Sequence, residues 1–154
     1  MKIGIISDTH VVNPHNCIVP EWVRQAFSGV DMIVHAGDVE RPEFLGELAT
    51  IAPVYAVRGN CDTGSFDVPT TLSVEIGCGL LTVAHRAGTA RAALSERSRV
   101  LVYGHTHISL INQENSLLVI NPGSPTLPRA GLPASVAVLS VCGEEISAEL
   151  KQRP

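Results

Sequence analysis

The stretch Val100-Leu101-Val102-Tyr103-Gly104-His105-Thr106-His107 joins an apolar run to two histidines that stand one residue apart. A short continuous apolar run is typical of a strand buried in a parallel sheet. The glycine then allows the backbone to turn sharply, and the imidazoles follow where the strand should end. The stretch therefore predicts a sheet that presents reactive or metal-binding side chains at the carboxyl end of a buried strand.

The same arrangement occurs three more times upstream. Apolar runs at 3–6, 32–34 and 54–57 are followed by Asp8-Thr9-His10, Gly37-Asp38 and Gly59-Asn60, respectively. Because the carboxyl ends of parallel strands meet at one edge of a sheet, we expect these side chains to lie close together. The repetition predicts one metal site with more than one ion at the rim of a sheet.

The order of the expected elements indicates an α/β fold. In the first half, strands are expected at 2–7, 31–35 and 54–57 and helices at 21–28 and 42–51, with a loop at 11–20. This β-α-β-α-β pattern predicts a parallel sheet. The second half should hold a helix at 90–97, a strand at 100–103 and three hairpins: 72–76 with 80–84, 108–113 with 117–121, and 134–141 with 145–150. Two sheets packed face to face, with helices outside, would accommodate both halves.

Composition restricts the class of protein. The 154 residues are 45% hydrophobic and 17% charged, which favours a single globular domain over residues 1–154. The net charge of −4, without a long basic run, disfavours an extended nucleic-acid-binding face. Polar residues come too early for a signal peptide, no apolar stretch is long enough to span a membrane, and the four cysteines are dispersed. We therefore expect a cytoplasmic protein with reduced thiols.

Seven side chains offer nitrogen or oxygen donors at the expected strand ends. They are Asp8, His10, Asp38, Asn60, His85, His105 and His107. Seven donors exceed what one tetrahedral ion takes and suit two divalent ions that share a carboxylate. A histidine-rich set favours Mn, Fe, Zn, Ni or Co over Ca or Mg. Two such ions, offset by two aspartates and a hydroxide, retain about one positive charge, which suits an anionic phosphate ester.

The complete set of motifs resembles a known family. Asp8-Thr9-His10, Gly37-Asp38, Gly59-Asn60-Cys61-Asp62, His85 and Gly104-His105-Thr106-His107 resemble the signature of the calcineurin-like metallophosphoesterases, and most of all their small single-domain bacterial and archaeal phosphodiesterases. The resemblance implies a four-layer α/β-β/α sandwich of two mixed sheets with a dinuclear metal site at the rim. It implies first-site ligands Asp8, His10 and His107, second-site ligands Asn60, His85 and His105, and a bridging Asp38. A homodimer or homotetramer is a further expectation of the family.

The function expected from this reading is metal-dependent hydrolysis of a small phosphodiester. A metal-bridging hydroxide attacks phosphorus, Mn²⁺ is the leading metal, and Asp38, Asn60, His105 and Arg86 are the expected catalytic residues. Two alternatives stay open, a phosphomonoesterase and a non-catalytic scaffold for protein assembly. A purine-nucleotide-binding regulator is disfavoured because the chain has no GxxxxGK[ST] loop.

Two positions depart from the family pattern. Cys61 stands where larger relatives often carry a histidine, and a thiol is a poor acid for a leaving group. We therefore expect leaving groups to be handled by Asp62 through water, or not at all. Arg86 stands where the family usually has glycine, and it either holds a phosphate oxygen or points to solvent. His35, inside an expected strand, is interpreted as a buried supporting residue.

Overall fold

The N-terminal half forms most of a five-stranded mixed sheet, here called sheet A. The computed structural model describes residues 1–13, 15, 17–64 and 67–154, so Pro14 and Asn16 of the expected 11–20 loop lie outside it. Sheet A has the order β10-β9-β1-β2-β3. Its strands are β1 (Lys2–Ile6), β2 (Met32–His35), β3 (Val54–Ala56), β9 (Ser135–Cys142) and β10 (Glu145–Gln152). β1, β2 and β3 are parallel, as the β-α-β-α-β pattern predicts, whereas β9 is antiparallel to β1 and β10.

The second sheet, sheet B, has the order β4-β5-β6-β8-β7. Its strands are β4 (Thr71–Glu75), β5 (Leu80–Ala84), β6 (Ser98–Val102), β7 (Leu110–Glu114) and β8 (Leu117–Asn121). β5, β6 and β8 are parallel, and the predicted hairpins β4–β5 and β7–β8 form its two edges. Each sheet is therefore mixed, because parallel strands from crossovers lie beside antiparallel hairpins.

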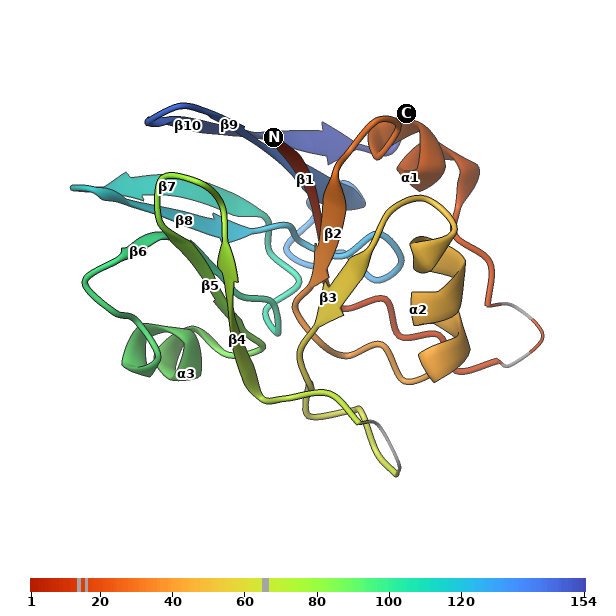
Figure 1. The fold of residues 1–154 in the computed structure, drawn as a ribbon. Helices are drawn as coiled ribbons and strands as arrows, with labels where there is room; N and C mark the ends of the chain where they lie inside the picture. The colour runs from red at the N-terminus through yellow and green to blue at the C-terminus, as the bar shows by residue number, and fades with distance from the viewer. Residues whose placement is uncertain (14, 16, 65–66) are drawn as a thin grey trace.

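The two sheets pack face to face with helices outside, which confirms the four-layer α/β-β/α sandwich. Ile5, Val34, Val83 and Val102 belong to the fully buried core between the sheets. The helices α1 (Glu21–Ala26) and α2 (Pro42–Ala49) cover sheet A through a second apolar cluster that includes Phe27. The helix α3 (Ala87–Ala92) covers sheet B. Figure 1 shows α1 and α2 beside β2 and β3, and α3 on the other side of the molecule.

The helix expected at 90–97 is displaced. The observed α3 begins at Ala87 and ends at Ala92. Ser98 accepts a hydrogen bond from the backbone N–H of Ser95 through its hydroxyl, and Ser98 donates its own N–H to the carbonyl of Ser95. Serine side chains that bond nearby backbone groups in this way compete with helical hydrogen bonds. The chain therefore turns at 95–98, and β6 begins at Ser98, two residues before the predicted start at 100.

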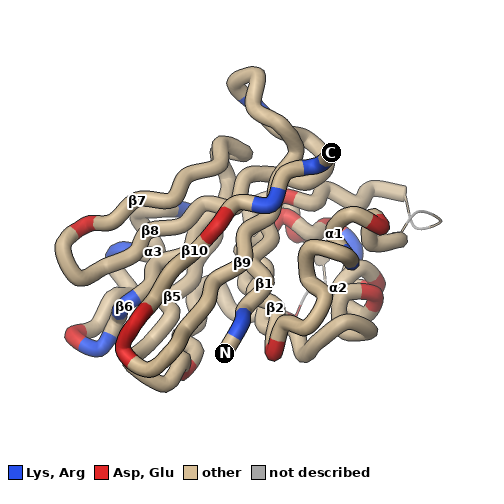
Figure 2. The backbone as a smooth tube through the Cα atoms, turned by 90° about the horizontal axis from the view of Figure 1, so that it is seen from above, with Lys and Arg blue, Asp and Glu red and all other residues tan. Residues whose placement is uncertain are grey.

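Charged residues are distributed in small groups over the surface. Seen from above the sandwich, basic and acidic positions are interspersed over the backbone (Figure 2). Among the described residues, none of the helices has the length and apolar character that a membrane span requires.

Candidate metal centre

The predicted donors come from five loops that meet at one rim of the sandwich. Asp8 and His10 follow β1, Asp38 follows β2 and Asn60 follows β3, all in sheet A. From sheet B, His85 follows β5, and the loop after β6 carries His105 and His107. Backbone hydrogen bonds tie adjacent loops together: Asp8 N–H donates to Gly37 O at 3.0 Å, and Gly104 N–H donates to His85 O at 3.0 Å.

The rim holds an unusual concentration of left-handed backbone. Six of the eight described non-glycine residues with positive φ lie here: Asp8, His10, Asp38, Glu40, His105 and His107. This conformation is disfavoured for residues with a Cβ and persists where the surroundings enforce it, commonly at functional sites. Alternating left-handed residues in the loops after β1 and β6 turn the Asp-x-His and His-x-His pairs toward the rim.

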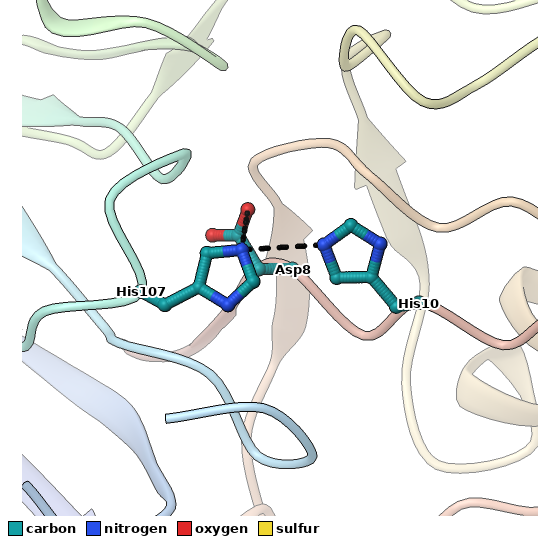
Figure 3. A group of neighbouring side chains, drawn as sticks. All are labelled: Asp8, His10 and His107. Atoms are coloured by element: carbon teal, nitrogen blue, oxygen red, sulfur yellow. Dashed lines mark hydrogen bonds and ion pairs between the residues drawn. The ribbon is translucent and has the colours of Figure 1, made fainter. Parts of the chain in front are cut away.

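The first cluster consists of Asp8, His10 and His107, whose donor atoms lie within 4.8 Å of one another. The Nε2 atom of His107 lies 3.5 Å from Asp8 Oδ1 and 3.3 Å from His10 Nε2. Figure 3 shows the two rings with these nitrogens turned toward each other beside the Asp8 carboxylate. The structure thus brings together the three residues expected at the first metal site.

The second cluster consists of Asp38, Asn60 and His85. The Nε2 atom of His85 lies 3.2 Å from Asp38 Oδ2 and 3.1 Å from Asn60 Oδ1. The same Asp38 oxygen is 3.7 Å from His10 Nε2 in the first cluster. Asp38 therefore lies between the clusters, which is the position that the expected bridging role requires.

His105 is the predicted donor that the structure places least closely. Its ring lies edge-on to His85 with centroids 5.2 Å apart, but it belongs to none of the donor groups found among the described residues. Its backbone N–H instead donates to the Asp8 carboxylate at 3.0 Å. Burial and the Arg86 guanidinium lower the pKa of His105, which favours the neutral imidazole that can bind a metal.

The hydrogen bonds of the other histidines fit a metal centre. The Nδ1 atom of His107 lies 2.7 Å from Leu127 O, and that of His85 lies 2.8 Å from Ala36 O. A carbonyl only accepts, so both Nδ1 atoms carry protons, and each ring turns its Nε2 atom to the rim. Ligating histidines are commonly oriented in this way. The Nε2 atom of His107 then lies beside Asp8 Oδ1 and His10 Nε2, where one cation would contact all three donors.

The pKa values of the buried groups also favour a cation at the rim. Burial raises the pKa of Asp8. Burial also opposes ionisation of Asp38, but hydrogen bonds from His85 and from the N–H of Cys61 outweigh it and hold the pKa well below its usual range. Burial lowers the pKa of His85, whereas Asp38 and the Ala36 carbonyl raise it by more. The second cluster therefore favours a positive charge at its centre, carried by a proton or by a metal ion.

The structure adds Glu40, which sequence reasoning missed. Its Oε1 atom accepts a hydrogen bond from His10 Nδ1 at 2.6 Å, which turns the Nε2 atom of His10 to the cluster. Glu40, His10 and Cys61 also form a donor group of their own. The spacing Asp38-Val39-Glu40, which repeats the Asp-x-His spacing after β1, was the available signal.

The proposed acid role of Asp62 is wrong. Asp62 is buried, and its two carboxylate oxygens accept four backbone N–H groups, from Asp38, Val39, Glu40 and Gly59, at 2.7–3.0 Å. A carboxylate so engaged has no access to a leaving group. Asp62 instead holds the loops after β2 and β3 together beneath the second cluster.

The loop after β8 supports the first cluster. Ser124 donates its hydroxyl to Asp8 O at 2.8 Å, and Thr126 donates to Thr9 O at 2.9 Å. Asn121 donates from its amide to Gly104 O at 3.0 Å. His35 is fully buried behind the rim, where it accepts the N–H of Gly37 at 3.1 Å and lies 3.1 Å from the Thr9 hydroxyl. This confirms the interpretation of His35 as a supporting residue.

Two glycines are required by close approach. A Cβ on Gly104 would collide with the Ser7 hydroxyl and come within 2.6 Å of Asp8 Oδ2. A Cβ on Gly59 would collide with the carboxylate and the backbone nitrogen of Asp38. Each glycine therefore lets one loop pass directly against a donor residue of one cluster, as expected for glycine beside a ligand.

A cavity of ≈ 370 Å³ adjoins the second cluster and is lined by Arg58, Arg86, Asn60, His85, Thr70 and Thr89, among others. Arg86 is exposed, and its Nη2 donates to Asn60 Oδ1 at 3.4 Å. Cys61 lies beside this amide, with Asn60 Nδ2 3.3 Å from its sulfur. Burial and Asp38 raise the pKa of Cys61 to about 11, so the thiol stays protonated near neutral pH.

The sequence is similar to those of known proteins. A family model described as the calcineurin-like phosphoesterase superfamily domain matches residues 1–144. A probable metallophosphoesterase of Methanothermobacter thermautotrophicus is 40% identical, over 97% of this chain and 91% of the relative.

Solved structures agree with the sequence matches. The phosphoesterase YfcE of Escherichia coli aligns with a TM-score of 0.71 at 31% identity, over 91% of this chain and 88% of that one. Vps29 of Entamoeba histolytica, solved in complex with Zn²⁺, aligns with a TM-score of 0.77 at 21% identity, over 99% and 98% of the two chains. At that identity the second match shows the fold alone.

Proposed function

Because the chain belongs to the calcineurin-like phosphoesterase superfamily, we propose that it is a metal-dependent phosphodiesterase that uses two divalent ions. The E. coli relative named phosphodiesterase YfcE, 32% identical over 90% of this chain, supports a diester as substrate. The observation that carries the proposal is the geometry of the rim. Two clusters of histidine nitrogens and carboxylate oxygens face each other across Asp38, at 3.2 and 3.7 Å.

The donor set fits two ions. His10, His107 and Asp8 would hold one, Asn60, His85 and His105 the other, and Asp38 would contact both. When bound, such a pair supplies a hydroxide nucleophile near neutral pH and neutralises charge on the phosphate. Mn²⁺ is the proposed metal, with Fe, Zn, Ni and Co as alternatives that the same donors accept.

The remaining roles belong to Asn60 of the second cluster and to two residues beside that cluster. Asn60 presents its Oδ1, which His85 and Arg86 also contact, to the second ion beside the phosphate site. Arg86 supplies a planar donor fork to a phosphate of the substrate. His105 lies over His85 and beside Arg86, where a neutral imidazole can bind an ion or donate to a phosphate oxygen.

The surroundings offer little help to a leaving group. The thiol of Cys61 is too weak an acid, and Asp62 is fully engaged by backbone N–H groups. The enzyme should therefore favour esters of acidic alcohols, above all aryl phosphodiesters. A plot of log kcat/KM against leaving-group pKa should be steep, and a flat plot would show that an acid does act.

The test is reconstitution. Protein stripped with a chelator should regain hydrolysis of bis-p-nitrophenyl phosphate with added Mn²⁺, reaching its maximum near two ions per chain. Asp38→Asn should lower kcat by about 10³-fold, because it weakens both sites at once. Asp31→Asn, the same change at an exposed residue immediately before β2, should have no effect. Equal activity of the two variants would contradict the proposal.

A second candidate function is a non-catalytic scaffold, which the fold match to Vps29 supports as an alternative. The same experiment separates the two functions. A protein that binds metal but hydrolyses neither diesters nor monoesters, with any of the five metals, would be a scaffold. Hydrolysis of p-nitrophenyl phosphate in preference to the diester would identify a phosphomonoesterase.

A further inference from the structure

We propose that the cavity beside the second cluster binds a second, non-scissile phosphate of the substrate. The proposal rests on the proposed phosphodiesterase function and names its substrate class. The natural substrate would be a phosphodiester that carries an additional phosphate group, as a phosphorylated nucleotide ester does.

The lining of the cavity has the chemistry of an anion site. Two guanidinium groups, of Arg58 and Arg86, line the ≈ 370 Å³ space together with the hydroxyl-bearing Thr70 and Thr89. Asp and Glu are absent from the lining, among the residues that the structure describes. Arginine forks bind phosphate through paired, charge-assisted hydrogen bonds, and hydroxyls add neutral donors.

Arg86 differs from the other arginine of its segment. Arg91, at the far end of α3, is paired with Glu114 at 2.9 Å. Within the described residues, Arg86 contacts only the Asn60 amide oxygen, at 3.4 Å, and has no carboxylate partner. Its positive charge is therefore uncompensated at the mouth of the cavity, and it lowers the pKa of His105 alongside burial.

The position of the cavity separates it from the scissile phosphate. Asn60 and His85 line it, whereas Asp38 and the whole first cluster do not. A phosphate held between the two clusters would thus lie beside the cavity and leave most of it free. On the opposite side, His10 borders a pocket lined largely by apolar residues such as Val12, Ile18 and Phe44. The metal centre thus has one basic flank and one apolar flank, and a second phosphate belongs on the basic one.

The test compares two substrates that differ by one phosphate. The p-nitrophenyl ester of thymidine 5′-phosphate and its 3′-phosphorylated form have the same scissile bond and the same leaving group. With Mn²⁺-loaded protein, kcat/KM should be about 10-fold or more higher for the 3′-phosphorylated ester, mainly through a lower KM. Arg86→Gln should remove most of this preference, and Arg86→Lys should keep part of it, because the charge remains without the fork.

Arg91→Gln is the matched control. It removes the same charge from the same segment but outside the cavity, so the preference should stay at its wild-type value. Three outcomes overturn the inference: equal kcat/KM for the two esters, a preference that Arg86→Gln retains, or an equal loss on both esters in Arg86→Gln, which would place Arg86 on the scissile phosphate. In each of these three outcomes the esters are still hydrolysed, so the proposed phosphodiesterase function stands. If the protein hydrolyses neither ester, both the inference and the proposed function are overturned.

Discussion

The two clusters of the rim differ in how firmly the protein holds them. In the first, Glu40 and Leu127 O fix the histidine rings, and the loop after β8 holds the backbone of Asp8. In the second, Ala36 O fixes His85, but Asn60 is exposed, and His105 joins no donor group among the residues that the structure describes. Rigid support lowers the cost of ordering ligands when an ion binds. The first cluster should therefore bind its ion more tightly. In the second cluster, the ligands should become ordered only when the ion binds.

The largest effects should come from the two glycines that pass against the clusters. Gly104→Ala disturbs Asp8 in the first cluster, and Gly59→Ala disturbs Asp38 in the second, so each should lower the free energy of unfolding by about 3–4 kcal/mol and abolish hydrolysis. Gly46→Ala in α2 meets no atom within 4 Å and should raise stability by about 1 kcal/mol. Urea denaturation measures all three, and a stable, active Gly104→Ala would refute the close packing of the first cluster.

Asp62→Asn should have the next largest effect. An amide at this position presents N–H groups to backbone donors, so two hydrogen bonds are lost and the free energy of unfolding should fall by about 3 kcal/mol. Activity should fall because the second cluster loosens, while the slope of log kcat/KM against leaving-group pKa stays unchanged. A slope that steepens in the variant would restore an acid role for Asp62.

Removal of metal should then distinguish the metal affinities of the two clusters. Competition with a chelator should show two binding steps, the weaker one belonging to the second cluster. Glu40→Gln should weaken the tighter step by about 10–100-fold, because it loosens the ring of His10. Glu43→Gln, on the exposed first turn of α2, is the control. If Glu40→Gln affected the weaker step instead, the assignment of the two sites would be reversed.

The smallest effect concerns pH. Burial lowers the pKa of His35 from 6.5 to about 4, so the folded protein binds its proton less readily than the unfolded chain. The neutral ring stabilises the fold above pH 6.5, and this contribution is lost as pH falls toward 4. His35 alone should cost about 1 kcal/mol of unfolding free energy between about pH 7 and about pH 5.5. NMR titration of the His35 ring measures this directly, and a midpoint near 6.5 would contradict the burial argument.

Much of the fold could be predicted because the apolar runs are short and well separated. β5 and β8 begin and end at the predicted residues, since a glycine turn or a polar turn limits each hairpin. The helix expected at 90–97 was misplaced because residues 95–98 form a turn, in which the Ser98 hydroxyl accepts the N–H of Ser95, a local contact that periodicity does not record.

The sequence by itself determined which residues can bind metal and that they stand at strand ends, because residue type and apolar patterning are local properties. Only the tertiary structure decided how these residues are divided between the two clusters. It placed Asp38 between the clusters, assigned Glu40 to His10, and turned Asp62 from a proposed acid into a backbone anchor. These roles depend on distances between loops that are far apart in the chain. Packing of the two sheets sets those distances, and spacing in the sequence does not encode them.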